Sequence, residues 1–431
     1  MDLFENYSEY VDKKVEIGIE AYRKGDAFIK VVDADGKALK NANVKVKQKN
    51  HEFKYGANIF MLDELETEEK NEKYKEYFKK AFNMATLPFY WDSTEPERGK
   101  LRYKKNSPRL YRRPPIDLCM EFCEKNGIEP REHALAYEHF FPEWLKGADS
   151  FTARYEFERR CREIAERYGD RIKTIEVTNE MFWEKGVTGF YKDPDFIDHC
   201  FKVARKYFPN NQLVINDWSV ICWDEAWPPV YYSQIEQSML RGAEIDALGL
   251  QYHMFFPFKD EYDSTRKFYN PLHLNSVMDK LATFRKPLQI TEVTIPAYSE
   301  SEENEQIQAE IIEKLYSIWF AHPAVEQIMY WNLVDGYAAF AEQGDMSAGE
   351  NYYYGGLLHF DLTPKPAYYK ICELFNERWR TALEIKSNEY GNASFRGFYG
   401  EYEITVTLGD KSICKTINVK KNADNKFEVQ L

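Results

Sequence analysis

Eight short runs rich in apolar and β-branched residues recur along the middle of the chain, with stretches of helical pattern between them. They are centred on residues 56–60, 82–87, 133–137, 174–178, 213–216, 247–251, 288–291 and 327–331. Runs of this kind are typical of parallel strands, because both faces of such a sheet are buried. A spacing of about 25–50 residues fits repeated β-loop-α units. The sequence therefore predicts a (β/α)8 TIM barrel over residues 53–380.

The two terminal segments have a different pattern. Residues 5–23 have a mixed, helical pattern, and residues 26–33 and 42–48 alternate around an Asp35-Gly36 turn, which predicts an antiparallel hairpin. Residues 400–408 and 412–419 alternate around Gly409-Asp410 in the same way. We expect residues 1–52 and 381–431 to combine into a small accessory β-sandwich beside the barrel.

Two glutamates stand at the ends of predicted strands: Glu180 ends the fourth and Glu292 the seventh. Barrel enzymes carry their catalytic groups at the carboxyl-terminal rim, where these strand ends meet. Two carboxyl groups about 5–5.5 Å apart can cleave a glycosidic bond with retention, one as acid/base and the other as nucleophile. A single glutamate at a strand end is more often an ion-pair partner, so the prediction depends on the pair.

Composition narrows the range of partners. A net charge of −13 argues against nucleic acid or an anionic membrane as the main partner, and no stretch has transmembrane length. The seven cysteines form no C-x2-C pair and no metal-ligand cluster stands out, so we expect no metal or other cofactor. The acidic start lacks the apolar core of a signal peptide. We therefore expect a cytoplasmic protein, or a secreted one if a leader was removed.

Short motifs surround the two glutamates in a fixed order. They are WDSTEPERG at 91–99, REHALAY at 131–137, VTNE at 177–180, VINDW at 214–218, ALGLQYH at 247–253, ITEVTI at 290–295, YWN at 330–332 and PKPAYY at 364–369. In this order and with these gaps the chain resembles glycoside hydrolase family 10, the (β/α)8 xylanases. The resemblance spans residues 53–376.

The resemblance implies roles for single residues. It implies that Glu180 is the acid/base, that Glu292 is the nucleophile, and that His253 hydrogen-bonds the nucleophile. Five further residues would contact the sugar: His133, Tyr137, Asn179, Gln251 and Trp331. Taken alone, His253 would more often be an ordinary core histidine, and Trp331 could be a plain core residue.

Three departures from the family pattern fall at the predicted cleft. Residues 84–90, MATLPFY, replace a family segment with polar sugar-binding side chains. Tyr137-Glu138 replaces a Trp-His pair, and Ala339, with Phe340 beside it, stands where the family has a second tryptophan. These changes predict a preserved reaction centre with a more apolar distal subsite.

A basic run follows the second predicted strand, with no acid inside it: Lys100, Arg102, Lys104, Lys105, Arg109, Arg112 and Arg113. One hypothesis is that some of these side chains bind a carboxylate on the substrate, such as a uronic acid branch, because guanidinium matches carboxylate bidentately. The alternative is a solvated loop that balances nearby acids.

The pattern as a whole predicts a retaining glycoside hydrolase for β-1,4-linked xylo-oligosaccharides or decorated xylan fragments. One alternative is a retaining β-glycosidase for another glycone, such as a β-glucoside or a sugar conjugate. The other is a non-catalytic carbohydrate-binding protein on the same barrel. The oligosaccharide is the only partner that the sequence indicates, and the oligomeric state stays open.

Overall fold

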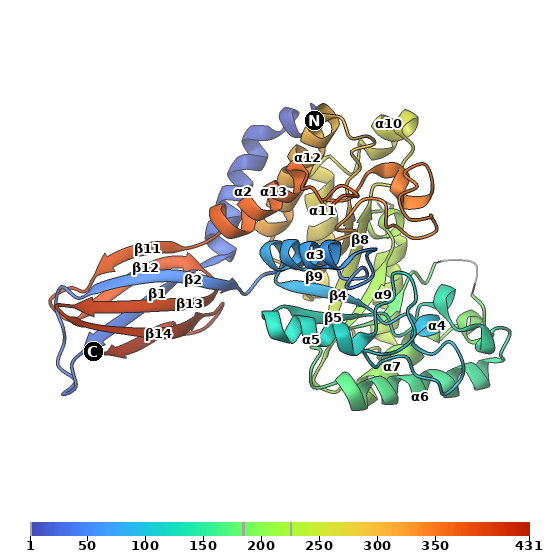
Figure 1. The fold of residues 1–431 in the computed structure, drawn as a ribbon, viewed down its shortest axis with the longest axis horizontal. Helices are drawn as coiled ribbons and strands as arrows, with labels where there is room; N and C mark the ends of the chain where they lie inside the picture. Colours follow the sequence, from blue (N-terminus) through green and yellow to red (C-terminus); the bar gives the residue numbers. More distant parts are fainter. Residues whose placement is uncertain (1, 183–185, 225) are drawn as a thin grey trace.

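The computed structural model describes residues 2–182, 186–224 and 226–431. Its larger body is a closed barrel of eight parallel strands in the order β10-β3-β4-β5-β6-β7-β8-β9 (Figure 1). The strands are β3 (Lys54–Asn58), β4 (Met84–Pro88), β5 (Glu129–His133), β6 (Thr174–Asn179), β7 (Gln212–Asp217), β8 (Ala247–His253), β9 (Leu288–Thr294) and β10 (Val325–Tyr330). The predicted (β/α)8 barrel is confirmed.

Long helices link these strands or follow the last one. They are α3 (Glu68–Ala81), α5 (Ile116–Asn126), α6 (Ser150–Tyr168), α7 (Phe196–Tyr207), α9 (Val230–Leu240), α11 (Pro271–Leu281), α12 (Glu302–Ala321) and α13 (Pro366–Glu373). Several begin at side-chain caps: Thr67, Asp149 and Ser301 accept backbone N–H groups at the starts of α3, α6 and α12. No helix among the described residues is both long and apolar enough to span a bilayer.

Short helices occupy the loops at the carboxyl rim and the start of the chain. They are α1 (Asp2–Asn6), α4 (Trp91–Thr94), α8 (Ser219–Cys222) and α10 (Glu261–Thr265), with single 3-10 turns at 138–140, 143–145, 190–192, 258–260, 282–284 and 349–353 and a π turn at 374–378. Helix α2 (Ser8–Tyr22) packs on α12, with Gly18 directly against Ala321.

The third barrel strand lies four residues earlier than predicted. We expected residues 133–137, whereas β5 is Glu129–His133 and the chain leaves the strand before Tyr137. The residues of β5 are polar and therefore do not resemble a buried strand. The barrel accommodates them because the Arg131 guanidinium pairs with the Glu176 carboxylate of β6 at 2.5 Å, with both side chains buried.

The smaller body is a β-sandwich built from both ends of the chain (Figure 1). One sheet has the order β12-β1-β15 and the other β11-β2-β13-β14. The strands are β1 (Lys24–Val32), β2 (Asn43–His51), β11 (Ala382–Lys386), β12 (Asn392–Phe398), β13 (Gly400–Leu408), β14 (Lys411–Val419) and β15 (Lys426–Gln430). Inward-facing residues such as Val31, Val44 and Ile404 form its core.

The prediction of an N-terminal hairpin was wrong. Strand β1 pairs with β12 and β15, while β2 pairs with β11 and β13, so the two strands lie in opposite sheets. The Asp33 side chain organises a turn at 33–37, as expected, but the chain then crosses to the other sheet. Pairing with C-terminal strands places β1 in a three-stranded sheet and β2 in a four-stranded sheet, and such sheets are more stable than an isolated two-stranded hairpin. The predicted pairing of 400–408 with 412–419 is confirmed.

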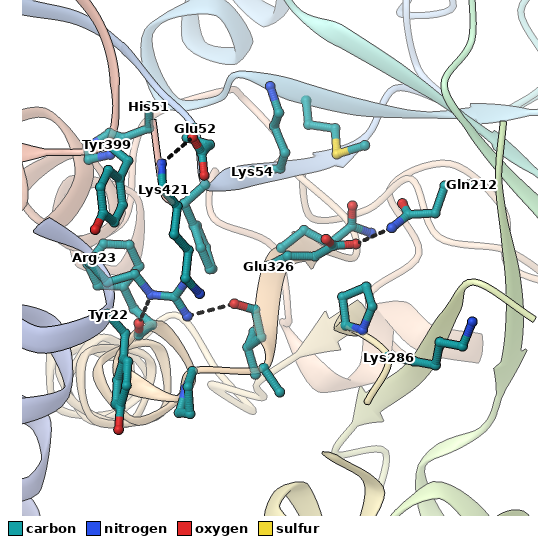
Figure 2. A pocket seen from close by; sticks show the side chains of 18 of the residues that line it. Tyr22, Arg23, His51, Glu52, Lys54, Gln212, Lys286, Glu326, Tyr399 and Lys421 are labelled. Carbon is teal, nitrogen blue, oxygen red and sulfur yellow. Dashed lines mark hydrogen bonds between the residues drawn. The ribbon is translucent and has the colours of Figure 1, made fainter. Parts of the chain in front are cut away.

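A polar cavity of about 470 Å³ lies where the sandwich meets the amino-terminal ends of the barrel strands (Figure 2). Its lining includes the strand-start residues Lys54, Gln212 and Glu326, and Gln212 donates to Glu326 at 2.8 Å. In this fold the amino-terminal face contributes to stability, and the chemistry takes place at the opposite face. The candidate site is accordingly at the other end of the barrel.

Candidate active site

A cleft of about 590 Å³ opens at the carboxyl-terminal ends of the barrel strands. It has the size of a typical small-ligand site. All eight residues that the sequence selected line it: His133, Tyr137, Asn179, Glu180, Gln251, His253, Glu292 and Trp331. They come from five different strands or the residues just after them, so only closure of the barrel brings them together.

Glu292 lies deep in the cleft and is 4 % exposed. Asn216 Nδ2 donates to its Oε1 at 3.1 Å, and His253 Nε2 lies 3.0 Å from its Oε2. Burial raises the pKa of Glu292 to about 8; the nearby His133 opposes this effect and the carboxylates of Glu176 and Glu180 add to it. These two hydrogen-bond partners hold the carboxyl group in one orientation.

His253 is a neutral hydrogen-bond partner of Glu292. Burial lowers the pKa of its imidazole to about 4, so near neutral pH the ring carries one proton. The Thr294 hydroxyl donates to the Trp331 carbonyl at 2.5 Å, so it accepts from His253 Nδ1–H at 2.9 Å. This leaves Nε2 as an acceptor that faces Glu292 Oε2 at 3.0 Å, where it can receive the proton of the Glu292 carboxyl group. Thr294 belongs to the same strand as Glu292, so β9 positions the glutamate and also the histidine beside it.

Glu180 follows β6 and has a backbone φ of +53°, in the left-handed region that side chains other than glycine seldom adopt. Tyr137 donates its hydroxyl to Glu180 Oε2 at 2.6 Å, and Gln251 Nε2 donates to Oε1 at 3.1 Å. Burial raises the pKa of Tyr137 well above its usual range, so its hydroxyl stays protonated and remains a donor. Such strained backbone is common where a side chain must be aimed at a reacting group.

A chain of amides connects the surroundings of the two glutamates. Asn179 Oδ1 accepts from Asn216 Nδ2 at 2.9 Å and from Gln251 Nε2 at 3.2 Å. Asn216 also donates to Glu292, and Gln251 also donates to Glu180. One hydrogen-bonded set therefore orients both carboxyl groups relative to each other.

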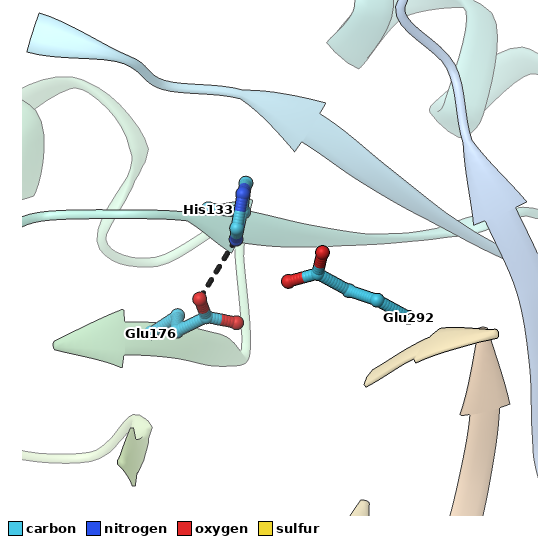
Figure 3. A group of neighbouring side chains, drawn as sticks. All are labelled: His133, Glu176 and Glu292. Carbon is cyan, nitrogen blue, oxygen red and sulfur yellow. Dashed lines mark hydrogen bonds and ion pairs between the residues drawn. The ribbon is translucent and has the colours of Figure 1, made fainter. Parts of the chain in front are cut away.

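His133, Glu176 and Glu292 form a close group with ligand atoms all within 4.8 Å, a distance at which such residues could hold a metal ion (Figure 3). Both ring nitrogens of His133 are already engaged: Nδ1 with Glu176 at 2.7 Å and Nε2 with the Tyr90 hydroxyl at 3.0 Å. Burial would lower the pKa of His133, but the Glu176 carboxylate outweighs it and raises that pKa. The group is therefore arranged as a proton-sharing and ion-paired network.

Four residues that the sequence did not select as site residues shape the cleft: Tyr90, Arg131, Glu176 and Asn216. Tyr90 lies in the segment that departs from the family pattern, and its hydroxyl reaches His133. Asn216 stood in the VINDW motif, and Glu176 lies directly before VTNE. Two-residue alternation would put Glu176 and Asn179 on opposite faces of the strand, and a register shift between Glu176 and Thr178 brings both into the network with Asn216. Arg131 began the REHALAY motif, but its burial was not expected because an arginine is seldom fully buried without a charged partner.

Aromatic rings line the mouth of the cleft. Trp331 is 6 % exposed and packs edge-on against Phe60, with ring centroids 5.1 Å apart. Phe340, beside the position of the missing tryptophan, is 77 % exposed and lines the same cleft. An exposed ring at a cleft mouth can pack on the apolar face of a sugar.

Three members of the basic run pair with acids away from the cleft. Lys100 pairs with Glu97, Lys105 with Glu121, and Arg109 with Glu64. Within the described residues, Arg112 and Arg113 are the members of the run that line the cleft.

A closed (β/α)8 barrel with two glutamates at its carboxyl rim, oriented by amides and a histidine, has the architecture of the barrel glycoside hydrolases. The sequence model of glycosyl hydrolase family 10 matches residues 46–374, most of the chain. The protein belongs to glycosyl hydrolase family 10.

Characterised relatives extend beyond this chain. It is 27% identical over 410 residues to anti-sigma-I factor RsgI6 of Acetivibrio thermocellus, covering 94% of this chain and 47% of that protein. It is 26% identical over 411 residues to endo-1,4-beta-xylanase 1 of Arabidopsis thaliana, covering 93% and 38%. The chain thus spans less than half the length of these relatives.

Solved structures have the same fold. Xylanase 10B of Thermotoga petrophila, in complex with xylobiose, is similar with a TM-score of 0.60 and 23% identity over 76% of this chain and 95% of that one. Native xylanase 10B of Thermotoga maritima is similar with a TM-score of 0.60 and 24% identity over 76% and 96%. The structures cover the barrel and agree with the confirmed architecture.

Proposed function

We propose that the protein is a retaining glycoside hydrolase that cleaves β-1,4-linked xylo-oligosaccharides or decorated xylan fragments. Glu180 protonates the leaving oxygen, and Glu292 attacks the anomeric carbon to form a glycosyl-enzyme. Water then releases the sugar, with Glu180 acting as base. The observation that carries the proposal is the shared amide network that holds both carboxyl groups in one cleft.

The remaining cleft residues fit roles in this reaction. Asn179 and Gln251 orient the glutamates, His253 supports the Glu292 carboxylate, and His133 lies beside the cleavage site. Tyr137 and Trp331 add a hydroxyl and an aromatic face for the sugar. The xylan preference is supported by family membership and by the xylobiose named in the complex of the Thermotoga petrophila enzyme.

Two variants separate the two catalytic roles. Glu292→Ala should abolish turnover on every substrate while leaving oligosaccharide binding largely intact, because no nucleophile remains. Glu180→Ala should lose activity on xylobiose yet retain cleavage of a nitrophenyl xyloside down to the glycosyl-enzyme, since that leaving group departs without protonation. Steady-state and burst kinetics on both substrates test this. Retained turnover in Glu292→Ala would overturn the assignment.

One observation favours specificity for a glycone other than xylose. The β4 segment 84–90 provides the Tyr90 ring where polar sugar-binding groups were expected from the family pattern. We therefore include a β-glucoside specificity as the rival function. Parallel assays on nitrophenyl xyloside, xylobioside and glucoside distinguish the xylan specificity from the β-glucoside specificity. NMR of the anomer released first tests retention. No cleavage of any substrate would favour the non-catalytic alternative.

A further inference from the structure

Arg113 presents a cation to the cleft. Burial lowers the pKa of its guanidinium group, and the Asp92 carboxylate, which forms no ion pair with it, opposes this effect. The Arg113 guanidinium lies 3.9 Å from the centroid of the Tyr90 ring and 5.5 Å from those of Phe60 and Phe140. Its Nη1 donates to the backbone carbonyl of Arg112 at 3.0 Å. Across residues 2–182, 186–224 and 226–431 it makes no ion pair within 4 Å, so most of its five N–H donors have no protein acceptor.

Arg112 adds a second charge beside the first. It is 3 % exposed, donates from Nη2 to Asn332 Oδ1 at 3.0 Å and from Nη1 to the Tyr337 carbonyl, and its buried Nε has no partner among the described residues. The nearby Glu350 is separated from it by the Asn332 amide, which donates to that carboxylate at 3.2 Å. Both acceptors of Arg112 are neutral.

Two adjacent guanidinium groups in partly desolvated surroundings repel each other and gain stability from an anion. This chain has a net charge of −13, so acids are abundant, and three other cations of the same loop are paired with them. Among the described residues, Arg112 and Arg113 form no ion pair and are the members of the run at the cleft. They also border a smaller cavity that continues from the cleft past Phe140 and Phe340 and has the Glu342 carboxylate in its lining. A substituent on a bound sugar chain would find room there.

We propose that Arg112 and Arg113 form a subsite for a carboxylate carried by the sugar chain, so that the preferred substrates are glycans that bear uronic acid. The inference rests on the proposed glycosidase function and specifies its substrate class. The planar guanidinium group can bind a carboxylate through two parallel hydrogen bonds, and the Tyr90 ring holds the plane of Arg113 in place.

Three matched substrates test the effect of the negative charge on the branch separately from the effect of the shape of the branch. They are a linear xylo-oligosaccharide, the same chain with one glucuronic acid branch, and that branched chain with the carboxyl group reduced to an alcohol. The wild type should have a kcat/KM about 10-fold or more higher on the uronate than on its reduced analogue, as charge-assisted hydrogen bonds allow. Raising the salt concentration should reduce this preference, because exposed charges are screened.

Variants of the loop identify the residue that causes the preference for the uronate substrate. Arg113→Met should lose about 10- to 100-fold in kcat/KM on the uronate and change little on the other two substrates. Arg113→Lys keeps the charge without the fork and should be intermediate. Lys104→Met is the matched control, since Lys104 is an exposed cation of the same loop outside the cleft, and it should behave as wild type.

The possible results distinguish failure of the carboxylate subsite from failure of the glycosidase function. Equal losses of Arg113→Met on all three substrates, or a wild type that does not distinguish the uronate from its reduced form at any salt concentration, would overturn the carboxylate subsite and leave the glycosidase function standing. A folded wild type that cleaves none of the three would overturn both.

Discussion

Tyr137 is the cleft residue whose contact departs most from what its sequence position suggested. It was expected as a sugar contact, and in the structure its hydroxyl donates to Glu180 Oε2 at 2.6 Å. A hydrogen bond to a carboxylate contributes more than one between neutral groups. The residue therefore acts on the acid/base itself as well as on the wall of the cleft.

Tyr137→Phe should lower kcat on xylobiose about 10-fold, because Glu180 loses the Tyr137 hydroxyl as an orienting donor. KM should change little, since the ring remains to line the cleft. Steady-state kinetics measure both parameters, and Tyr155→Phe, at a 62 % exposed tyrosine on α6, is the control. A rise in KM with kcat unchanged would instead make Tyr137 a plain sugar contact.

Glu292 links stability to pH. Its carboxyl group has a pKa of about 8 when folded, against a usual 4.5. Between these values the unfolded chain releases the proton while the folded protein keeps it, so stability falls as pH rises from about 4.5 to 8 and is level above that.

Glu292→Gln removes this dependence because an amide does not ionise. The unfolding free energy of the variant minus that of the wild type should therefore be about 2–4 kcal/mol larger at pH 8 than at pH 5, because only the wild type loses stability over this range. Urea denaturation at the two pH values measures the difference, with Glu389→Gln as an exposed control. The same gain at both pH values would mean that Glu292 has an ordinary pKa.

At the scale of single elements, α2 is attached to the barrel through its glycine. A Cβ built on Gly18 would lie 2.5 Å from the Ala321 carbonyl oxygen and 3.0 Å from its Cβ, so the two helices are close enough that only glycine fits. In an isolated helix, alanine is better than glycine by about 1 kcal/mol.

Gly18→Ala should therefore lower stability, by about 1–3 kcal/mol, although it raises helix propensity. The melting temperature measured by calorimetry should fall, whereas Glu16→Ala on the exposed face of the same helix should leave it nearly unchanged. A higher melting temperature for Gly18→Ala would show that α2 can move away from α12 without loss.

For the whole molecule, Arg23 joins the sandwich to the barrel. It stands between α2 and β1, and its guanidinium donates to the carbonyls of Phe320, His322 and Val325 between the end of α12 and β10 (Figure 2). Burial lowers the pKa of this arginine to about 10, and the carbonyls are the partners that compensate for its desolvation.

Arg23→Met should destabilise the protein by about 2–4 kcal/mol, because three carbonyls lose their donor at once. We expect the sandwich to melt earlier than the barrel, giving two calorimetric transitions, with kcat at 25 °C unchanged because the cleft is at the opposite end. Lys24→Met removes a partly exposed pair with Glu20 and should cost less than 1 kcal/mol. A single unshifted transition in Arg23→Met would disprove the coupling.

The sequence by itself determined the barrel, the terminal sandwich and the eight cleft residues, because apolar periodicity and motif order are local properties of the chain. Glu180 and Glu292 were placed on one rim by counting strands alone. The position of β5 and the pairing of β1 and β2 were decided only by the tertiary structure. Arg131 is buried because Glu176 on the neighbouring strand pairs with it. Strand β1 pairs with β12 and β15 and not with β2. Folding likewise decided that Arg112 and Arg113 line the cleft, whereas Lys105 and Arg109 pair with acids distant in sequence.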